Sequence, residues 1–168
     1  MGGGKSLQFK LKSKVNDMIR EIVQVGDPVL RRVCESVTRF DGELAQLLDD
    51  MKETLKNAEG AGLAAPQVGV PVRAVQVDVE EGFFEMVNPV LVSQKGEQTG
   101  PEGCLSVRGK AGTVTRPDKV KVVFSDRNGN RCSLVARGFF ARAVCHELDH
   151  LDGVLYTDKA KNVHDVED

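Results

Sequence analysis

The chain has 168 residues, close to the length of one domain, and its 40% hydrophobic and 29% charged content is that of an ordinary globular protein. Its 23 basic and 25 acidic side chains leave a formal charge of −2, which argues against non-specific nucleic-acid binding as the main activity. The four cysteines form no C-x-x-C pair, which excludes a zinc ribbon or a thioredoxin-like motif. No apolar run reaches the ~18 residues needed to span a bilayer.

The N-terminal end of the chain is basic. Residues 1–15 contain four lysines and no acidic side chain, so a basic extension is predicted over residues 1–20. Its first six residues match a P-loop, a myristoylation signal or a trimmed transit peptide only loosely. A disordered or loosely helical start is the preferred interpretation. One folded domain is expected over residues 21–160, followed by a polar tail at 161–168.

Two amphipathic helices are predicted, one near each end of the domain. A turn at Gly26-Asp27-Pro28 precedes a short apolar stretch at 29–37. Apolar residues then recur at helical spacing over residues 41–57. The same period returns over residues 139–151.

Between these helices the period changes to that of strands. Runs rich in β-branched residues occupy 72–79, 83–92, 120–124 and 132–135. The dipeptide Asn128-Gly129, between the last two runs, is a strong hairpin signal. Strands segregated between helices predict an α+β domain.

The strongest chemical signal lies in the second predicted helix, where residues 146–150 have the sequence H-E-L-D-H. His146 and His150 are one turn apart and project from the same face, close enough to bind one metal ion. Glu147 sits at the edge of that face, where it can reach a water on the metal rather than the metal itself. A chance arrangement is the alternative, but the chain has only three histidines.

A catalytic metal of this kind takes a third protein ligand and keeps one position open. The extended motif of zinc proteases would place that ligand at Tyr156, and the downstream candidates Glu167 and His164 lie near the chain end. An upstream thiolate is the stronger candidate. Cys104 is preferred because a glycine beside it lets the backbone approach a site closely. Cys145, in contrast, points about 100° away from the histidine face.

A glycine-rich segment at residues 60–67 matches a dinucleotide fingerprint, with Asp78 at about the expected distance. Its context is wrong, because an amphipathic helix precedes it and Pro66 interrupts it. A dinucleotide-binding enzyme is therefore rejected. The preferred interpretation is a flexible loop that brings the Gln67 side chain to a site.

Together these motifs resemble those of the peptide deformylase family. Residues 60–67, 102–106 and 146–150 look like its three signature motifs in the same order, and residues 26–31 resemble a further family segment. The resemblance covers residues 22–159. It implies a single-domain α+β fold in which antiparallel strands pack around the helix that carries the metal ligands.

By this resemblance the chain binds one divalent metal ion, natively Fe²⁺, which Zn²⁺, Ni²⁺ or Co²⁺ can replace. The implied ligands are Cys104, His146 and His150. The implied reaction removes the formyl group from the N-terminal formylmethionine of nascent proteins and releases formate. A metal-activated hydroxide would attack the formyl carbon, with Glu147 as the general acid/base.

The remaining implied roles concern the substrate. The Gln67 side chain and the Leu105 backbone N–H would stabilise the oxyanion, and Gly62 would contact the substrate backbone. The substrate is expected to be an extended peptide end, which an edge strand could bind by β-augmentation.

Three positions depart from the usual family pattern, namely Arg108, Cys145 and Tyr156. None of them removes an implied ligand, the acid/base or an oxyanion donor, so they bear on substrate preference.

Three alternative functions stay open. The chain could be a zinc peptidase with another third ligand, a protein that only binds peptide ends, or an enzyme acting on another formyl amide.

The expected partners are N-formylmethionyl nascent peptides near the ribosome, with no direct DNA binding and no membrane. The few, unpaired cysteines and the lack of a clear targeting segment favour a bacterial-type cytoplasm. An organelle is the alternative.

Overall fold

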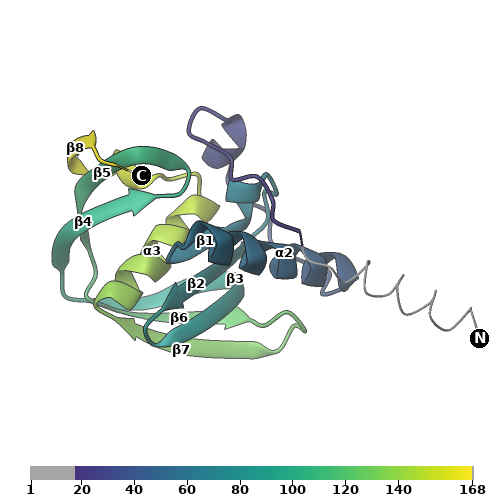
Figure 1. Cartoon of the computed structure of the whole chain (residues 1–168). Helices are drawn as coiled ribbons and strands as arrows, with labels where there is room; N and C mark the ends of the chain where they lie inside the picture. The colour runs from purple at the N-terminus through teal and green to yellow at the C-terminus, as the bar shows by residue number, and fades with distance from the viewer. Residues whose placement is uncertain (1–17, 168) are drawn as a thin grey trace, which may run out of the picture.

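The computed structural model describes residues 18–167. Most of the extension predicted at 1–20 lies outside the described residues. The described residues form two α-helices, α2 (Gly42–Ala58) and α3 (Phe139–Leu151), and two antiparallel sheets (Figure 1). Both helices lie where the apolar period predicted them, to within one residue at each end. Within the described part of the chain, no helix is long and apolar enough to cross a membrane.

The larger sheet has the strand order β1-β2-β3-β6-β7, and each neighbouring pair is antiparallel. The 126–130 turn joins β6 to β7 and contains the predicted Asn128-Gly129 hairpin signal, with Gly129 at a φ of 87°. The predicted strands of the middle of the chain are confirmed as parts of this sheet. The bounds are Gly62–Ala64 (β1), Ala74–Val79 (β2), Gly82–Lys95 (β3), Lys119–Ser125 (β6) and Arg131–Arg137 (β7).

The smaller sheet was not predicted. It has the order β4-β5-β8, with bounds Gln98–Cys104 (β4), Val107–Arg116 (β5) and Lys161–Asp165 (β8). Two glycines and Pro101 make β4 a poor strand by composition, and its place at the sheet edge is where a proline is tolerated. Residues 161–165, which the sequence analysis left in a polar tail, pair with β5 instead.

Two predicted turns or loops have more regular structure than expected. Asp27 caps a 3₁₀ turn, η1 (Pro28–Arg31), by accepting a hydrogen bond from Val29 N–H at 3.0 Å. The segment predicted as a flexible loop at 60–67 forms β1, paired with β2, and most of a second turn, η2 (Ala65–Val68). A third 3₁₀ turn, η3 (Tyr156–Asp158), follows α3.

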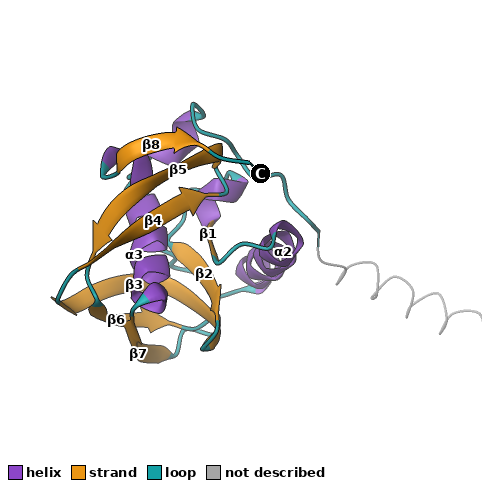
Figure 2. Ribbon diagram, turned by 60° about the vertical axis from the view of Figure 1, so that its left-hand side comes forward, coloured by secondary structure: helices purple, strands orange, loops and turns teal. Residues whose placement is uncertain are grey.

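Helix α3 lies between the two sheets (Figure 2), and its apolar side forms the main core with the larger sheet. Helix α2 packs its own apolar face against the start of that sheet in a second cluster. This arrangement confirms the predicted single-domain α+β fold with antiparallel strands around the histidine-bearing helix. To this core α3 contributes Phe140, Ala141, Val144 and Leu151, among others, and the larger sheet contributes Val75, Val77, Met86 and Val122.

Candidate active site

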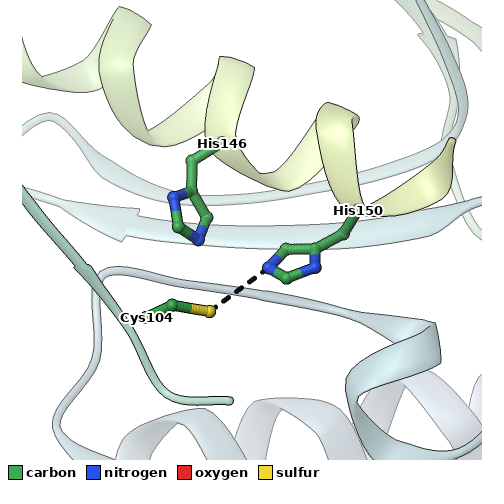
Figure 3. Close-up of side chains that lie close together, drawn as sticks. All are labelled: Cys104, His146 and His150. Carbon is green, nitrogen blue, oxygen red and sulfur yellow. Dashed lines mark hydrogen bonds between the residues drawn. The ribbon is translucent and has the colours of Figure 1, made fainter. Parts of the chain in front are cut away.

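Cys104, His146 and His150 converge from two different elements (Figure 3). Cys104 ends strand β4, and the two histidines lie one turn apart on α3. Their ligand atoms lie within 4.8 Å of one another, and Cys104 Sγ is 3.4 Å from His150 Nε2. Among the described residues this is the only group of three or more such side chains close enough to hold an ion. One thiolate and two imidazoles form a donor set that fits a transition-metal ion.

Glu102 orients the first histidine. Its carboxylate lies 2.7 Å from His146 Nδ1 and accepts hydrogen bonds from Arg116 Nη2 at 2.6 Å and Arg142 Nη1 at 2.8 Å. Burial alone would raise the pKa of Glu102, but the hydrogen bonds from His146 and Arg116 lower it to about 2. The ionised carboxylate therefore keeps the proton on Nδ1 and leaves the Nε2 lone pair for the ion.

His150 is 1% exposed, and burial lowers its pKa well below the ordinary value. It is therefore neutral at physiological pH, which is the state that binds a metal. Its Nδ1 has no hydrogen-bond partner within residues 18–167.

Glu147 lies beside the three ligands without joining them. Its Oε2 is 4.0 Å from His146 Nε2, and its Oε1 lacks a hydrogen-bond partner among the described residues. Burial raises the pKa of this carboxyl group to about 7. A Cβ at Gly62 would collide with this carboxyl group, lying 2.9 Å from its Cδ. A glycine there makes room for a buried carboxyl group that can exchange a proton near neutral pH.

Gln67 is held with its amide nitrogen toward the same centre. Its Oε1 accepts from Ala64 N–H at 2.9 Å, and because that group only donates, the oxygen must lie on that side. Its Nε2 donates to Ser106 Oγ at 3.0 Å and lies 3.6 Å from Cys104 Sγ. Leu105, in the turn after Cys104, lines the same cavity.

Except for His150, these side chains line a cavity of about 310 Å³. Its walls come from the 60–67 segment, strand β4 with its turn, and one face of α3. A larger cavity, of about 430 Å³, is lined in part by Cys145 and lies away from the ligand group. Six of the seven site residues named by the sequence analysis thus line one cavity, and the seventh, His150, lies beside it within the ligand group.

None of the weighed alternatives for the third ligand belongs to the ligand group. His164 is in the exposed strand β8, where its Nδ1 lies 2.7 Å from the Asn162 carbonyl oxygen. Tyr156 packs its ring against His146, with ring centroids 6.1 Å apart, but it offers no nitrogen or sulfur donor. Cys145 lines the larger cavity.

Sequence reasoning missed the residues that support this site, namely Glu102, Arg116, Arg142 and Ser106. Glu102 and Ser106 lie in the 102–106 motif that the sequence analysis singled out. Their closeness in sequence to Cys104 could have indicated that they belong to the site. No sequence signal pointed to the two arginines, because they pair with Glu102 from other elements of the fold.

Comparison with known proteins identifies the family. The model of the polypeptide deformylase family matches residues 19–166. The chain belongs to this family. A peptide deformylase of Agathobacter rectalis is 51% identical over 149 residues, which are 88% of this chain and 94% of that protein. One from Caldanaerobacter subterraneus is 49% identical over 150 residues, 89% of this chain and 94% of that protein.

Solved deformylase structures share the fold. The enzyme from Legionella pneumophila superposes with a TM-score of 0.82 at 39% identity, covering 86% of this chain and 87% of that one. The enzyme from Synechococcus elongatus, in complex with actinonin, gives a TM-score of 0.82 at 38% identity over 88% and 83%. These matches confirm the resemblance seen in the sequence motifs, and the chain is an enzyme of this metal-dependent family.

Proposed function

We propose that the chain removes the formyl group from the N-terminal formylmethionine of nascent peptides and releases formate. The observation that carries the proposal is the group of three candidate ligands, of which Cys104 and His146 line one cavity together with Glu147 and Gln67. Relatives that cover almost the whole chain and are named peptide deformylase support the same reaction.

Cys104, His146 and His150 would hold one divalent ion, natively Fe²⁺, with Zn²⁺, Ni²⁺ or Co²⁺ as substitutes. A thiolate among the ligands favours a softer ion than three imidazoles would. When bound, the ion supplies Lewis-acid polarisation and lowers the pKa of water. The buried Glu102, ionised between its cationic partners, supports the choice of His146 as a ligand.

Glu147 would move the protons of the reaction. With a pKa of about 7, its carboxylate can take a proton from the attacking water, and the resulting acid can protonate the departing amine nitrogen. Its unpartnered Oε1 faces no competing hydrogen bond from residues 18–167. Burial at 3% exposure also keeps bulk water from supplying the proton instead.

Gln67 and Leu105 would stabilise the negative oxygen that forms as the formyl carbon is attacked. One Gln67 N–H donates to Ser106 Oγ, and the other, which lies toward Cys104 Sγ at 3.6 Å, would turn to the substrate oxygen once the thiolate binds the ion. The Leu105 backbone N–H, in the turn after Cys104, would be the second donor. Such donors act most strongly where they are already oriented. Gly62, in strand β1 at the sheet edge, would contact an extended substrate backbone.

The test is formate release from a formyl-methionyl tripeptide by the full chain, purified anaerobically with ferrous iron retained. We expect rapid release that fades in air, because a thiolate–iron site is open to oxidation. The zinc-peptidase alternative predicts cleavage of internal peptide bonds instead. The binding-only alternative predicts that the metallated protein binds the tripeptide and releases no formate.

The cellular setting is part of the proposal. The relatives named above come from bacteria, which supports action on nascent chains in a bacterial-type cytoplasm, near the ribosome. The division of the chain into an extension at 1–20, a catalytic domain at 21–160 and a terminal segment at 161–168 stays a prediction. Strand β8 favours extending the catalytic domain to about residue 165.

A further inference from the structure

An extended segment, residues 22–25, lies between the two loops that carry the proposed oxyanion donors. Val23 N–H donates to the Gln67 carbonyl at 2.8 Å, and Val25 N–H donates to the Ser106 carbonyl at 2.8 Å. The first bond holds turn η2 and the second holds the turn between β4 and β5. One short stretch of backbone therefore links two loops that are 39 residues apart in the chain.

Gln24, between these two bonds, directs its side chain at the β4–β5 turn. Its Nε2 donates to the Leu105 carbonyl at 2.9 Å and to the Ile22 carbonyl at 3.2 Å. Its Oε1 accepts from Arg108 N–H at 3.4 Å. The carboxamide therefore holds the turn on both sides of Ser106. The Leu105 carbonyl is separated from the Leu105 N–H only by the φ and ψ angles of that residue, so holding the carbonyl limits the backbone conformations that set the direction of the N–H.

Other contacts hold the same turn from the 60–67 segment. The Leu105 side chain lies over Gly60, where an added Cβ would be 2.8 Å from Leu105 Cδ1. Ser106 is fully buried, and its hydroxyl accepts the hydrogen bond from Gln67 Nε2. The turn is thus held by residues 60–67 through Gly60 and Gln67, and by residues 22–25 through Gln24.

We propose that Gln24 is a positioning residue for the reaction, which keeps the Leu105 N–H at a fixed distance from the Gln67 amide. This inference rests on the proposed function, because it takes these two groups as the oxyanion donors. A shift of about 1 Å in a reacting geometry can cost on the order of 100-fold in rate. The segment at residues 22–25, which is bonded to both donor loops, should therefore affect the rate. The hydrogen bonds of Gln24 go to Ile22, Leu105 and Arg108, none of which is a proposed metal ligand.

The experiment compares Gln24→Ala and Gln24→Glu with Glu21→Ala, a control at the exposed position just before this segment. Gln24→Glu keeps an acceptor for Arg108 N–H but loses both donors. We expect both Gln24 variants to lower kcat for a formyl-methionyl tripeptide about 10-fold, with KM and metal content unchanged. The absorption spectrum of the Co²⁺-substituted proteins should also match the wild type, because the ligands are undisturbed. The proposal is overturned if both Gln24 variants have the same kcat as Glu21→Ala. It is also overturned if only the KM rises or only the metal content falls.

A double-mutant cycle with Ser106→Ala tests whether Gln24 acts through the same turn. If it does, adding Gln24→Ala to Ser106→Ala lowers kcat much less than it does in the wild type. Additive losses contradict the proposal, since they mean that the two residues act separately.

A measurement without turnover separates this inference from the proposed function. In the zinc-loaded chain without substrate, Gln24→Ala should speed amide hydrogen exchange at Leu105 and Ser106, and Glu21→Ala should not. Unchanged exchange at both amides overturns the positioning role. If the wild type releases no formate, the proposed function fails, and the exchange rates alone then decide whether Gln24 holds the turn.

Discussion

Two cavities flank helix α3, and they differ in how their charged groups are used. In the larger one, of about 430 Å³, every lining cation is paired with a carboxylate: Arg73 with Asp152, and both Arg116 and Lys159 with Asp149. In the smaller one, of about 310 Å³, Glu147 keeps a buried oxygen without a partner among the described residues. Size therefore does not mark the reactive cavity, whereas a buried and unsatisfied titratable group does.

Arg116 connects the two cavities. It is 2% exposed, donates to Asp149 Oδ2 at 2.6 Å on one side and holds Glu102 on the other, and Glu102 in turn holds His146. The paired charges beside the larger cavity thus support a proposed metal ligand of the smaller one. Substitutions on the two sides should separate reacting groups from supporting ones.

The largest effect is expected from Glu147→Ala. Losing the general acid/base should lower kcat for formate release by roughly 10²–10⁴-fold. Metal content, measured by elemental analysis, should equal that of the wild type because Glu147 is not a proposed ligand. Near-normal turnover in this variant would remove Glu147 from the mechanism.

The two cysteines of the cavities form a matched pair. Cys104→Ser should lose most of its metal and activity during purification, because a serine hydroxyl is a much weaker ligand than a thiolate. Cys145→Ser should keep both, since Cys145 lines the larger cavity and burial raises its pKa to about 11, away from the reactive range. Metal analysis and formate release measure the two outcomes. Equal metal content in both variants would contradict the proposed ligand set.

A smaller effect is expected one step away from the ion. Glu102→Gln keeps the shape but removes the charge beside His146, and should weaken metal affinity about 10–100-fold. Asp149→Asn changes only the outer partner of Arg116, so its effect on metal affinity should be clearly smaller. Competition with a chelator gives both affinities. If Asp149→Asn lowered metal affinity as much as Glu102→Gln, the support for His146 would depend equally on Asp149, Arg116 and Glu102.

The smallest effect is expected at the rim of the larger cavity. Asp152→Asn breaks the ion pair with Arg73, but the Asp152 side chain is 57% exposed and solvent screens the pair. The free energy of unfolding should change by no more than about 0.5 kcal/mol, and formate release should stay at the wild-type rate. Denaturant unfolding checks the first value. A loss of activity would show that this cavity takes part in the reaction.

Much of this molecule could be predicted from local pattern. The periods of α2, α3 and the strands of the larger sheet are visible in short windows, since each element buries one apolar face. The H-E-L-D-H sequence also places His146 and His150 on one helical face without any tertiary information. The smaller sheet was missed because glycines and Pro101 dilute the strand pattern of β4, whose conformation depends on pairing with β5.

The sequence by itself determined the two histidines, the acid beside them and the family motifs that led to Cys104. Only the tertiary structure decided how these groups are held. Glu102 finds its partners 14, 40 and 44 residues away, and Gln24 reaches Leu105 across 81 residues. Local periodicity carries no information about such contacts, because they form only when separate elements pack and bury their polar groups against one another.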